Sequence, residues 1–397
     1  MQKQITSALL VAGTCIGGGT IALPMALAKL GIVPSLMIMI FVWLLTYYTS
    51  LVSVELNLQS ERGLSLGMLG KVLGGKIAGI IGEISVKLLC YALMSVYIYG
   101  AASIVQKLIE VYWHCNISDV AAESGIAVLT LLMLLCPFKT VSRINNIAFM
   151  GFTLIFLMLI CVMINFVNCE VIPWAINPSA NNIVSVVTIV FTSFGYQVIF
   201  HTLRDYCGKN VKILRRAFFY GSVIPVIVYM LWIGSALSVI FKSNPEFFAQ
   251  MIVGKVEVGD FVKELAGISK IPNFQILVWW MSILAIFTSI IGVGLGLEES
   301  LELFLKDNVN SEKTRKLMAV LLTVVPAYIV ASVVPNAFIK ILRFAGTILV
   351  VIAILLPVYL FFKADIKKPY LTELKKFPLL LCVLIGLGIM LIEFFGY

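Results

Sequence analysis

The sequence has few of the residues with which a water-soluble domain covers its surface. Only 12% of the 397 residues are charged, whereas 61% are hydrophobic. A soluble domain has roughly 25% charged residues and about half apolar ones. Apolar runs near the length of roughly 20 residues that crosses the hydrocarbon core recur along the whole chain. The shortage of charge therefore excludes a soluble globular protein and predicts a polytopic integral membrane protein.

Residues that build metal or redox centres are also scarce. The two histidines, His114 and His201, are far apart, and the eight cysteines form no Cys-x-x-Cys pair. We therefore expect small buried cysteine side chains, no cofactor, no firmly held metal ion, and a protein that is not an enzyme. Only Cys115 and Cys169 are expected to meet an oxidising compartment, and the sequence leaves open whether they pair.

The chain shows no linker, no low-complexity tract and no cleavable signal sequence, because the first apolar run lacks a small-residue cleavage site. We expect a single transmembrane domain over residues 1–397. The longest stretch outside the membrane is predicted at 242–272. Its apolar residues recur at helical spacing, which predicts short amphipathic helices on the outer surface.

The apolar runs predict eleven membrane spans, which put the two ends of the chain on opposite sides. Most of the 29 lysines and arginines then fall in loops on the side of the N-terminus. The positive-inside rule therefore predicts a cytoplasmic N-terminus and a periplasmic C-terminus. The same topology explains the net charge of +9, so the bilayer and not a nucleic acid is the expected partner; the oligomeric state stays open. The predicted spans are 5–29, 33–56, 77–106, 120–136, 144–166, 183–203, 213–241, 274–304, 316–334, 336–362 and 377–395.

Two of these spans contain helix-breaking clusters. The first reads GTCIGGGTIALP (13–24) and the second VFTSFGYQVIFH (190–201). The clusters occupy equivalent places if the first ten spans form two inverted halves, at 1–166 and 183–362, followed by an extra helix at 377–395. Broken helices in corresponding positions of inverted halves are typical of secondary transporters with a midplane site.

An unwound helix frees backbone groups that lipid cannot satisfy but a polar ligand can. Free N–H groups and a helix dipole suit a carboxylate, and opposed carbonyls suit an ammonium group. The alternative is that small residues only let helices pack closely, but the paired breaks favour a ligand site. The candidate groups are the N–H groups of Gly18, Gly19 and Thr20 and the carbonyls of Ile16, Ser193 and Phe194.

Four stretches resemble the hydroxy/aromatic amino acid permease family, the bacterial tyrosine and tryptophan permeases of the amino acid–polyamine–organocation superfamily. They are GTCIGGGTIALP, YALMSVYIYG (91–100), FTSFGYQ (191–197) and FTSIIGVGLGLEESLELF (287–304), and the resemblance covers essentially the full length. It implies an all-α, leucine-transporter-like fold with broken spans 1 and 6. It also implies proton-coupled uptake of an aromatic amino acid across the bacterial inner membrane, with tyrosine before tryptophan or phenylalanine. Sodium coupling and a non-aromatic neutral substrate are the alternatives.

The resemblance also assigns residues. Gly17, Gly18 and Gly19 match the family's first unwound segment, and Phe194 with Gly195 matches the second. Two positions depart from the family's pattern. Gln197 stands where the family often has a histidine, while His201 follows four residues later. Lys87 stands where an apolar residue is expected.

Charged groups inside spans are candidates for the coupling of transport to an ion. Lys87 lies one turn after Glu83, and a cation in the membrane interior is costly unless it is paired, snorkels to the interface or serves function. The pair is therefore either structural or a titrating element of the transport cycle. His201 is a further candidate for proton coupling.

Other polar side chains are predicted to line the substrate site. Tyr91 and Ser95 follow Lys87 at helical spacing, and Gln197 with Phe194 would complete the side-chain pocket, with Phe344 as an outer gate. Thr288 and Ser289 are adjacent hydroxyls that either bond back to their own helix or hold a sodium ion. The resemblance to leucine-transporter-like proteins implies that a sodium ion would also be held by the carbonyls of Gly13 and Ile16.

Overall fold

The computed structural model describes residues 2–167, 172–176, 180–268, 273–334, 337–364, 366, 369–371 and 373–395. Every regular element in these residues is helical, and they contain no strand. Cys169 lies outside the described residues, so the question whether it pairs with Cys115 stays open.

The helices follow the predicted spans closely. The elements are α1 (Gln2–Cys15), α2 (Gly19–Leu27), α3 (Ile32–Gln59), α4 (Leu66–Leu69), η1 (Gly70–Gly74), α5 (Lys76–Trp113), α6 (Asp119–Leu135), α7 (Phe138–Ile164), α8 (Ala180–Thr192), η2 (Tyr196–Ile199), α9 (Phe200–Cys207), α10 (Val211–Ser243), α11 (Pro245–Ile252), α12 (Val258–Gly267), α13 (Phe274–Leu305), α14 (Glu312–Val333), α15 (Ala337–Val350), η3 (Val351–Leu355), α16 (Leu356–Lys363) and α17 (Lys376–Phe395).

The predicted membrane-spanning character is confirmed. Within the described ranges, nine helical segments are long and apolar enough to cross a bilayer, and α1 with α2 forms a tenth that is bent by 53°. The predicted span 120–136 coincides with α6, whose 17 residues are at the short end of what a span needs. Each predicted span thus coincides with a helix or with a group of consecutive helices.

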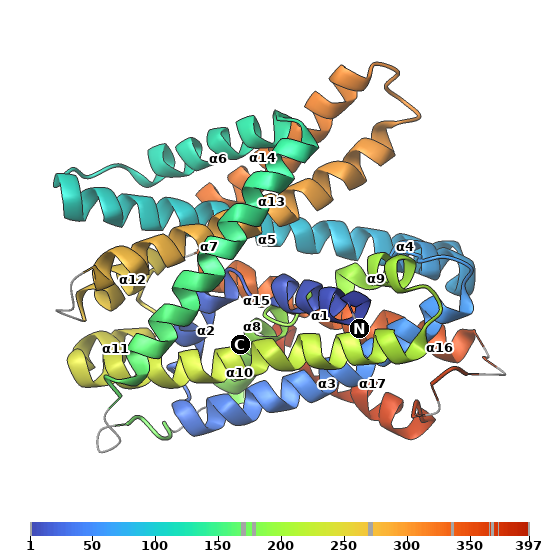
Figure 1. Cartoon of the computed structure of the whole chain (residues 1–397), viewed down its shortest axis with the longest axis horizontal. Coiled ribbons are helices and arrows are strands. Elements are labelled where there is room, and N and C mark those ends of the chain that lie inside the picture. The colour runs from blue at the N-terminus through green and yellow to red at the C-terminus, as the bar shows by residue number, and fades with distance from the viewer. Residues whose placement is uncertain are drawn as a thin grey trace.

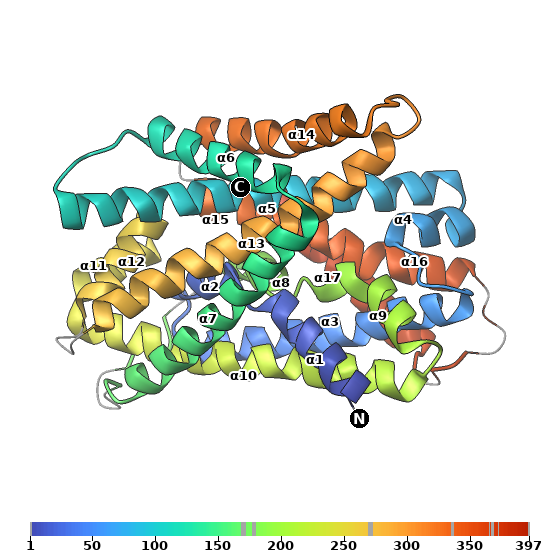
Figure 2. The same cartoon turned by 45° about the horizontal axis from the view of Figure 1, so that its top comes forward.

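The long helices form a bundle that is crossed obliquely by α7 and α13 (Figures 1 and 2). The short helices α4 and α9 lie at one end of the bundle, and α11 and α12 lie at the other. We call these the α9 end and the α12 end. The short helices α11 and α12 confirm the amphipathic helices predicted within 242–272.

The broken helices lie in the middle of the bundle, and their burial reflects this. Every residue of α2 from Thr20 to Leu27 is buried. In the apolar stretch of α17, by contrast, only 22% is buried. A helix that is apolar all round is stable in water only when it is covered, but in a membrane lipid can cover it. The exposed apolar side chains of α17 and α7 are therefore the lipid-facing surface, and α2 belongs to the interior.

At the α12 end, α12 packs on α5 through polar contacts. The Lys107 ammonium lies 3.1 Å from Asp260, and Lys263 lies 2.8 Å from Glu110. The backbone N–H of Gly259 donates to Ser103 Oγ at 2.9 Å, and the Tyr99 hydroxyl donates to Glu257 at 2.7 Å. These contacts close the bundle on this side.

Candidate functional site

The first break lies between α1 and α2. Three consecutive glycines disfavour helix by about 1 kcal/mol each relative to alanine, and the helix stops at Cys15 and resumes at Gly19. Thr20 closes the turn, because its hydroxyl donates to the Gly17 carbonyl at 2.8 Å. The Gly18 N–H donates to Ser289 Oγ on α13 at 3.1 Å. The predicted unwinding of this segment is therefore present.

Each glycine of the break approaches a different neighbour more closely than a side chain would allow. A Cβ on Gly17 would lie 2.6 Å from Ser289 Oγ, and one on Gly18 would lie 2.5 Å from Tyr97 Cε1. A Cβ on Gly19 would lie 2.9 Å from Ser193 Oγ, which belongs to the second break. Glycine is needed here because α5, α13 and the second break all converge on this backbone.

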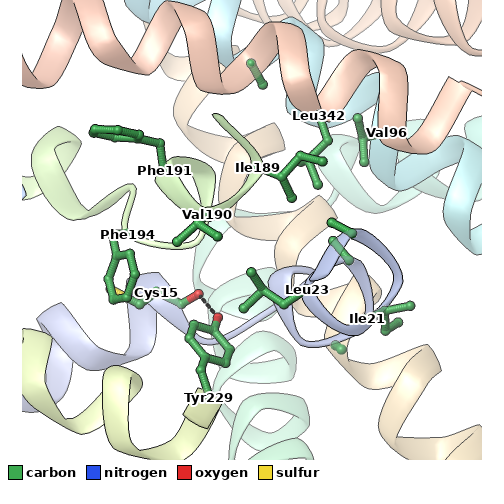
Figure 3. Close-up of a cluster of buried hydrophobic side chains, with 14 of the residues drawn as sticks. Cys15, Ile21, Leu23, Val96, Ile189, Val190, Phe191, Phe194, Tyr229 and Leu342 are labelled. Carbon is green, nitrogen blue, oxygen red and sulfur yellow. Dashed lines mark hydrogen bonds between the residues drawn. The ribbon is translucent and has the colours of Figure 1, made fainter. Parts of the chain in front are cut away.

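Two buried side chains of α10 hold the carbonyls on either side of the break. The Tyr229 hydroxyl donates to the Cys15 carbonyl at 2.7 Å, as Figure 3 shows, and Trp232 Nε1 donates to the Thr20 carbonyl at 2.6 Å. Carbonyls left without partners in lipid or in a dry core would be costly. Tyr229 and Trp232 therefore stabilise the unwound conformation, and no sequence motif singles them out.

Replacement of Tyr229 by phenylalanine tests this. We expect Tyr229→Phe to lower the free energy of unfolding by about 1–3 kcal/mol, because it leaves the buried Cys15 carbonyl without its donor. Thermal unfolding of the purified protein in detergent measures the change. Tyr220→Phe on the same helix is the control, because Tyr220 is 51% exposed. Equal stability of Tyr229→Phe and Tyr220→Phe would contradict this role.

The second break follows α8. The helix ends at Thr192, and the chain passes through a turn and η2 before α9 begins at Phe200. Phe194 is fully buried, with its ring edge-on to Tyr229 at 6.4 Å between centroids (Figure 3). In the described part of the chain, neither Ser193 Oγ nor either polar atom of the Gln197 amide has a hydrogen-bond partner, although all three are buried. The hydrogen-bonding capacity of these three atoms is therefore unused within the described residues.

A cavity of about 580 Å³ lies beside the two breaks, within the size range of small-molecule sites. We call it the central cavity. It extends toward the α9 end, because its walls include the first half of α7 and the second half of α13, which lie on that side of the bundle (Figures 1 and 2). Its lining is Leu9, Leu10, Gly13, Thr14, Cys15, Ile16, Gly17, Gly18, Gly19, Val86, Leu89, Cys90, Leu93, Tyr97, Asn145, Asn146, Phe149, Thr192, Gly195, Val198, Ile199, Thr288, Ser289, Gly292, Val293, Gly296, Leu342 and Leu349.

The central cavity brings together eight of the predicted site residues: Gly13, Ile16, Gly17, Gly18, Gly19, Gly195, Thr288 and Ser289. Thr20 and Ser193 are buried next to it, within the two breaks. The others lie outside its lining: Glu83, Lys87, Tyr91, Ser95, Phe194, Gln197, His201 and Phe344. Phe344 is 43% exposed. Their functional roles stay predictions.

The face of α5 that lines the cavity differs from the polar stripe that the sequence suggested. Val86, Cys90, Leu93 and Tyr97 line it at helical spacing. The predicted lining residues Tyr91 and Ser95 are offset from these positions by one or two residues, and the Ser95 hydroxyl donates to the Tyr91 carbonyl of its own helix at 2.9 Å. The Tyr91 hydroxyl donates to the Leu322 carbonyl of α14 at 2.9 Å. The sequence did not identify Tyr97 as a lining residue. Polar side chains in a membrane bundle also form contacts between helices, so a tyrosine in a span does not by itself indicate a cavity.

The other candidate groups have local partners. Lys87 lies 2.7 Å from Glu83, and its ammonium is 5.0 Å from the centre of the Phe304 ring. The pair that the sequence suggested therefore exists. The Thr288 and Ser289 hydroxyls donate to Leu284 and Ala285 of their own helix, at 2.9 and 2.8 Å. Ser289 Oγ remains an acceptor, as its contact with Gly18 shows.

Polar residues of α7 extend the site. Asn145 and Asn146 line the central cavity near the α9 end, and Asn145 Oδ1 is buried with no hydrogen-bond partner in the described part of the chain. An Asn-Asn pair within an apolar helix is a sequence signal that could have identified them. No group of three or more His, Cys, Asp or Glu side chains among the described residues could hold a metal ion. A cation in this cavity would have to bind hydroxyl, amide and carbonyl oxygens.

Comparison with known proteins places these features in a family. The model of the tryptophan/tyrosine permease family matches residues 1–393. The chain is similar to tyrosine-specific transport system 1 of Haemophilus influenzae, with 30% identity over 92% of this chain and 89% of that protein. It is 29% identical to the low affinity tryptophan permease of Escherichia coli, over 91% and 87% of the two chains. It is also 23% identical to glutamine transporter 2 of Aliivibrio fischeri, over 89% and 87%.

Proposed function

This chain belongs to the tryptophan/tyrosine permease family, and on that premise we propose that it imports an aromatic amino acid, tyrosine first, by proton symport. Family membership confirms that it is an amino acid transport protein of the membrane and not an enzyme. The observation that carries the proposal is the meeting of the two breaks at the central cavity. The bacterial permeases to which it is similar indicate the inner membrane.

We further propose the leucine-transporter-like arrangement of two inverted five-helix repeats. The packing of helices that would be equivalent supports it. Such helices pack against each other in three pairs, α3 with α10, α5 with α13 and α6 with α14. The contact of α5 with α15 also has its counterpart in the contact of α13 with α7. An internal two-fold relation produces paired contacts of this kind.

One contact differs in extent between the two proposed repeats, and this difference supports alternating access. α15 packs extensively along α8, whereas its counterpart α7 makes little contact with α1. The central cavity is lined here by Leu9 and Leu10 of α1 and by Asn145 and Asn146 of α7. From this asymmetry we infer a conformation that is open toward the α9 end and closed toward the α12 end. With the N-terminus in the cytoplasm, as we propose, it is inward-facing.

For the substrate, we propose that its carboxylate binds the backbone of Gly17–Gly19, where N–H groups and the start of α2 favour an anion. The carbonyls of the two breaks would accept hydrogen bonds from the ammonium group. The aromatic side chain would lie against the apolar walls of the cavity, which include Leu89, Leu93 and Phe149. Such a ring buries roughly 150–250 Å², and the apolar lining matches it.

Competition for uptake tests the substrate class. Labelled tyrosine is supplied to proteoliposomes with each of the twenty amino acids as a competitor. We expect tyrosine, tryptophan and phenylalanine to inhibit uptake at least about tenfold more strongly than lysine or glutamate, since burial of an unpaired charge is costly. Glutamine is the critical control, because one relative is a glutamine transporter. Stronger inhibition by glutamine than by any aromatic amino acid would replace the proposal with a non-aromatic neutral substrate.

A further inference from the structure

A second cavity, of about 210 Å³, lies toward the α12 end. We call it the outer cavity. Its walls carry an unusual concentration of positive charge for the interior of a membrane protein. The polar and charged lining residues are Lys29, Tyr99, Ser185, Glu257, Lys340 and Arg343.

The outer and central cavities lie on the same four helices, α2, α5, α8 and α15. On α8, Thr192 lines the central cavity and Ile189, one turn away, lines the outer one. On α15, Leu342 and Phe338 are likewise one turn apart. The two cavities therefore follow one another along a single route through the bundle.

A thin layer of apolar side chains separates the two cavities. Figure 3 shows Ile189 and Leu342 beside each other, with Val96 to the right of Leu342 and Leu23 of α2 below. All four side chains are buried, with 0% exposure for Leu23 and Val96. Ile189 lines the outer cavity and Leu342 the central one, so passage between the cavities would require these side chains to move apart.

Some of the charged groups that line the outer cavity have partners, whereas others have unused hydrogen-bond donors. Arg343 lies 3.0 Å from Glu393, and Glu257 accepts the hydrogen bond of Tyr99. Arg343 Nε is buried and has no hydrogen-bond partner among the described residues. For Lys29, whose ammonium lies beside Gly254 of the loop between α11 and α12, the contacts within the described ranges include no ion pair or hydrogen bond. The Lys29 ammonium and Arg343 Nε are therefore two donors at this cavity that favour an anion.

We propose that the outer cavity is a capture site for the carboxylate of the incoming amino acid, which binds Lys29 and Arg343 before the apolar layer opens. This inference rests on the proposed import of an amino acid. A carboxylate forms strong charge-assisted hydrogen bonds with ammonium and guanidinium groups. Glu257, which also lines this cavity, suits the α-ammonium group, so the lining matches a zwitterion. Its positive lining also raises the local concentration of anionic groups.

Removal of the Lys29 charge is the test. In proteoliposomes that transport tyrosine, we expect Lys29→Met to lower kcat/KM for entry from the α12 side about tenfold, with kcat nearly unchanged. Lys29→Arg, which keeps the positive charge, should retain most of the wild-type kcat/KM. The dissociation constant of tyrosine in the purified protein should stay within about twofold of wild type, because the central cavity that we propose to hold it does not include Lys29.

Lys255→Met is the matched control. Lys255 follows Gly254 directly but is exposed and does not line the cavity, so its loss should leave KM unchanged. Lysine beyond the end of α2 also interacts favourably with that helix dipole, so thermal stability is measured for each variant. If Lys255→Met raised KM as much as Lys29→Met does, the proposal would be overturned. The increase in KM would then come from the loss of surface charge in general.

Two analogues identify the group that is captured. With wild type, 3-(4-hydroxyphenyl)propionate, which keeps the carboxylate, should inhibit entry better than tyramine, which lacks it. With Lys29→Met this preference should disappear. If wild-type uptake instead depended on anionic lipid, and Lys29→Met removed that dependence without changing the preference, the cavity would bind a lipid headgroup and the proposal would be wrong. Absence of any amino acid uptake by wild type would overturn the proposed function itself, whereas an unchanged KM in Lys29→Met would overturn only the capture site.

Discussion

Gly18→Leu should abolish substrate binding and uptake while the protein still inserts and folds. Even the Cβ atom of a side chain at this position would lie 2.5 Å from Tyr97 Cε1. This atom is part of a rigid aromatic ring, so it cannot move away unless the whole tyrosine side chain moves. A leucine would displace either Tyr97 or the unwound segment. The amide groups that we propose for the carboxylate would then no longer face the cavity.

Alanine at the same position gives a graded version of the experiment. Overpacking in a closely packed interior typically costs 1–3 kcal/mol, so we expect Gly18→Ala to weaken tyrosine binding by about tenfold to 100-fold. Binding of labelled tyrosine to the purified protein measures the affinity. Size-exclusion chromatography and thermal unfolding report separately whether the fold is intact.

Gly292→Ala is the control for this pair. Gly292 lines the same cavity from α13, but a Cβ there would meet nothing within 4 Å. Its replacement therefore adds the same carbon to the same cavity without a clash. We expect affinity close to that of wild type. Wild-type binding by Gly18→Leu would contradict the assignment of the carboxylate site to this backbone.

The second large effect concerns the coupling ion. We expect tyrosine to accumulate in proteoliposomes when the outside is more acidic than the inside. One pH unit corresponds to 1.36 kcal/mol, which raises the accumulation ratio about tenfold if one proton accompanies each substrate. A sodium gradient at equal pH should drive no accumulation. Uptake that follows sodium and ignores the pH gradient would reject proton symport.

Lys87→Met tests one candidate group for this coupling. Lys87 forms the ion pair with Glu83 on α5, outside the central cavity. If this pair titrates during the cycle, Lys87→Met should lose accumulation driven by pH while exchange of tyrosine across the membrane is partly retained. Lys76→Met removes the same charge at the exposed start of α5 and should keep the coupling. Full pH-driven accumulation in Lys87→Met would leave His201 as the candidate.

If sodium couples instead, the hydroxyl of Thr288 is the group to remove. It lines the central cavity together with Gly13 and Ile16, and Thr288→Val keeps its shape while it removes the oxygen. The variant should then lose dependence on external sodium. Unchanged sodium dependence in Thr288→Val would exclude this hydroxyl as a ligand.

The sequence by itself determined the membrane-spanning character, the positions of the helices and the first unwound segment. These properties are local. A run of apolar residues is expensive to expose to water wherever it lies, and consecutive glycines weaken a helix regardless of what surrounds it. The cluster Gly17–Gly19 therefore identified the break between α1 and α2 from composition alone.

Only the tertiary structure decided which side chains meet the cavity. In water, an apolar stripe shows which face of a helix is buried, but lipid and protein interior are both apolar, so this signal is weak in a membrane. Tyr91 and Tyr97 are both tyrosines of α5, yet Tyr91 bonds to α14 and Tyr97 lines the cavity. The donors to the break, Tyr229 and Trp232, come from more than 200 residues along the chain. Their proximity to Cys15 and Thr20 depends on how helices pack, which no local pattern encodes.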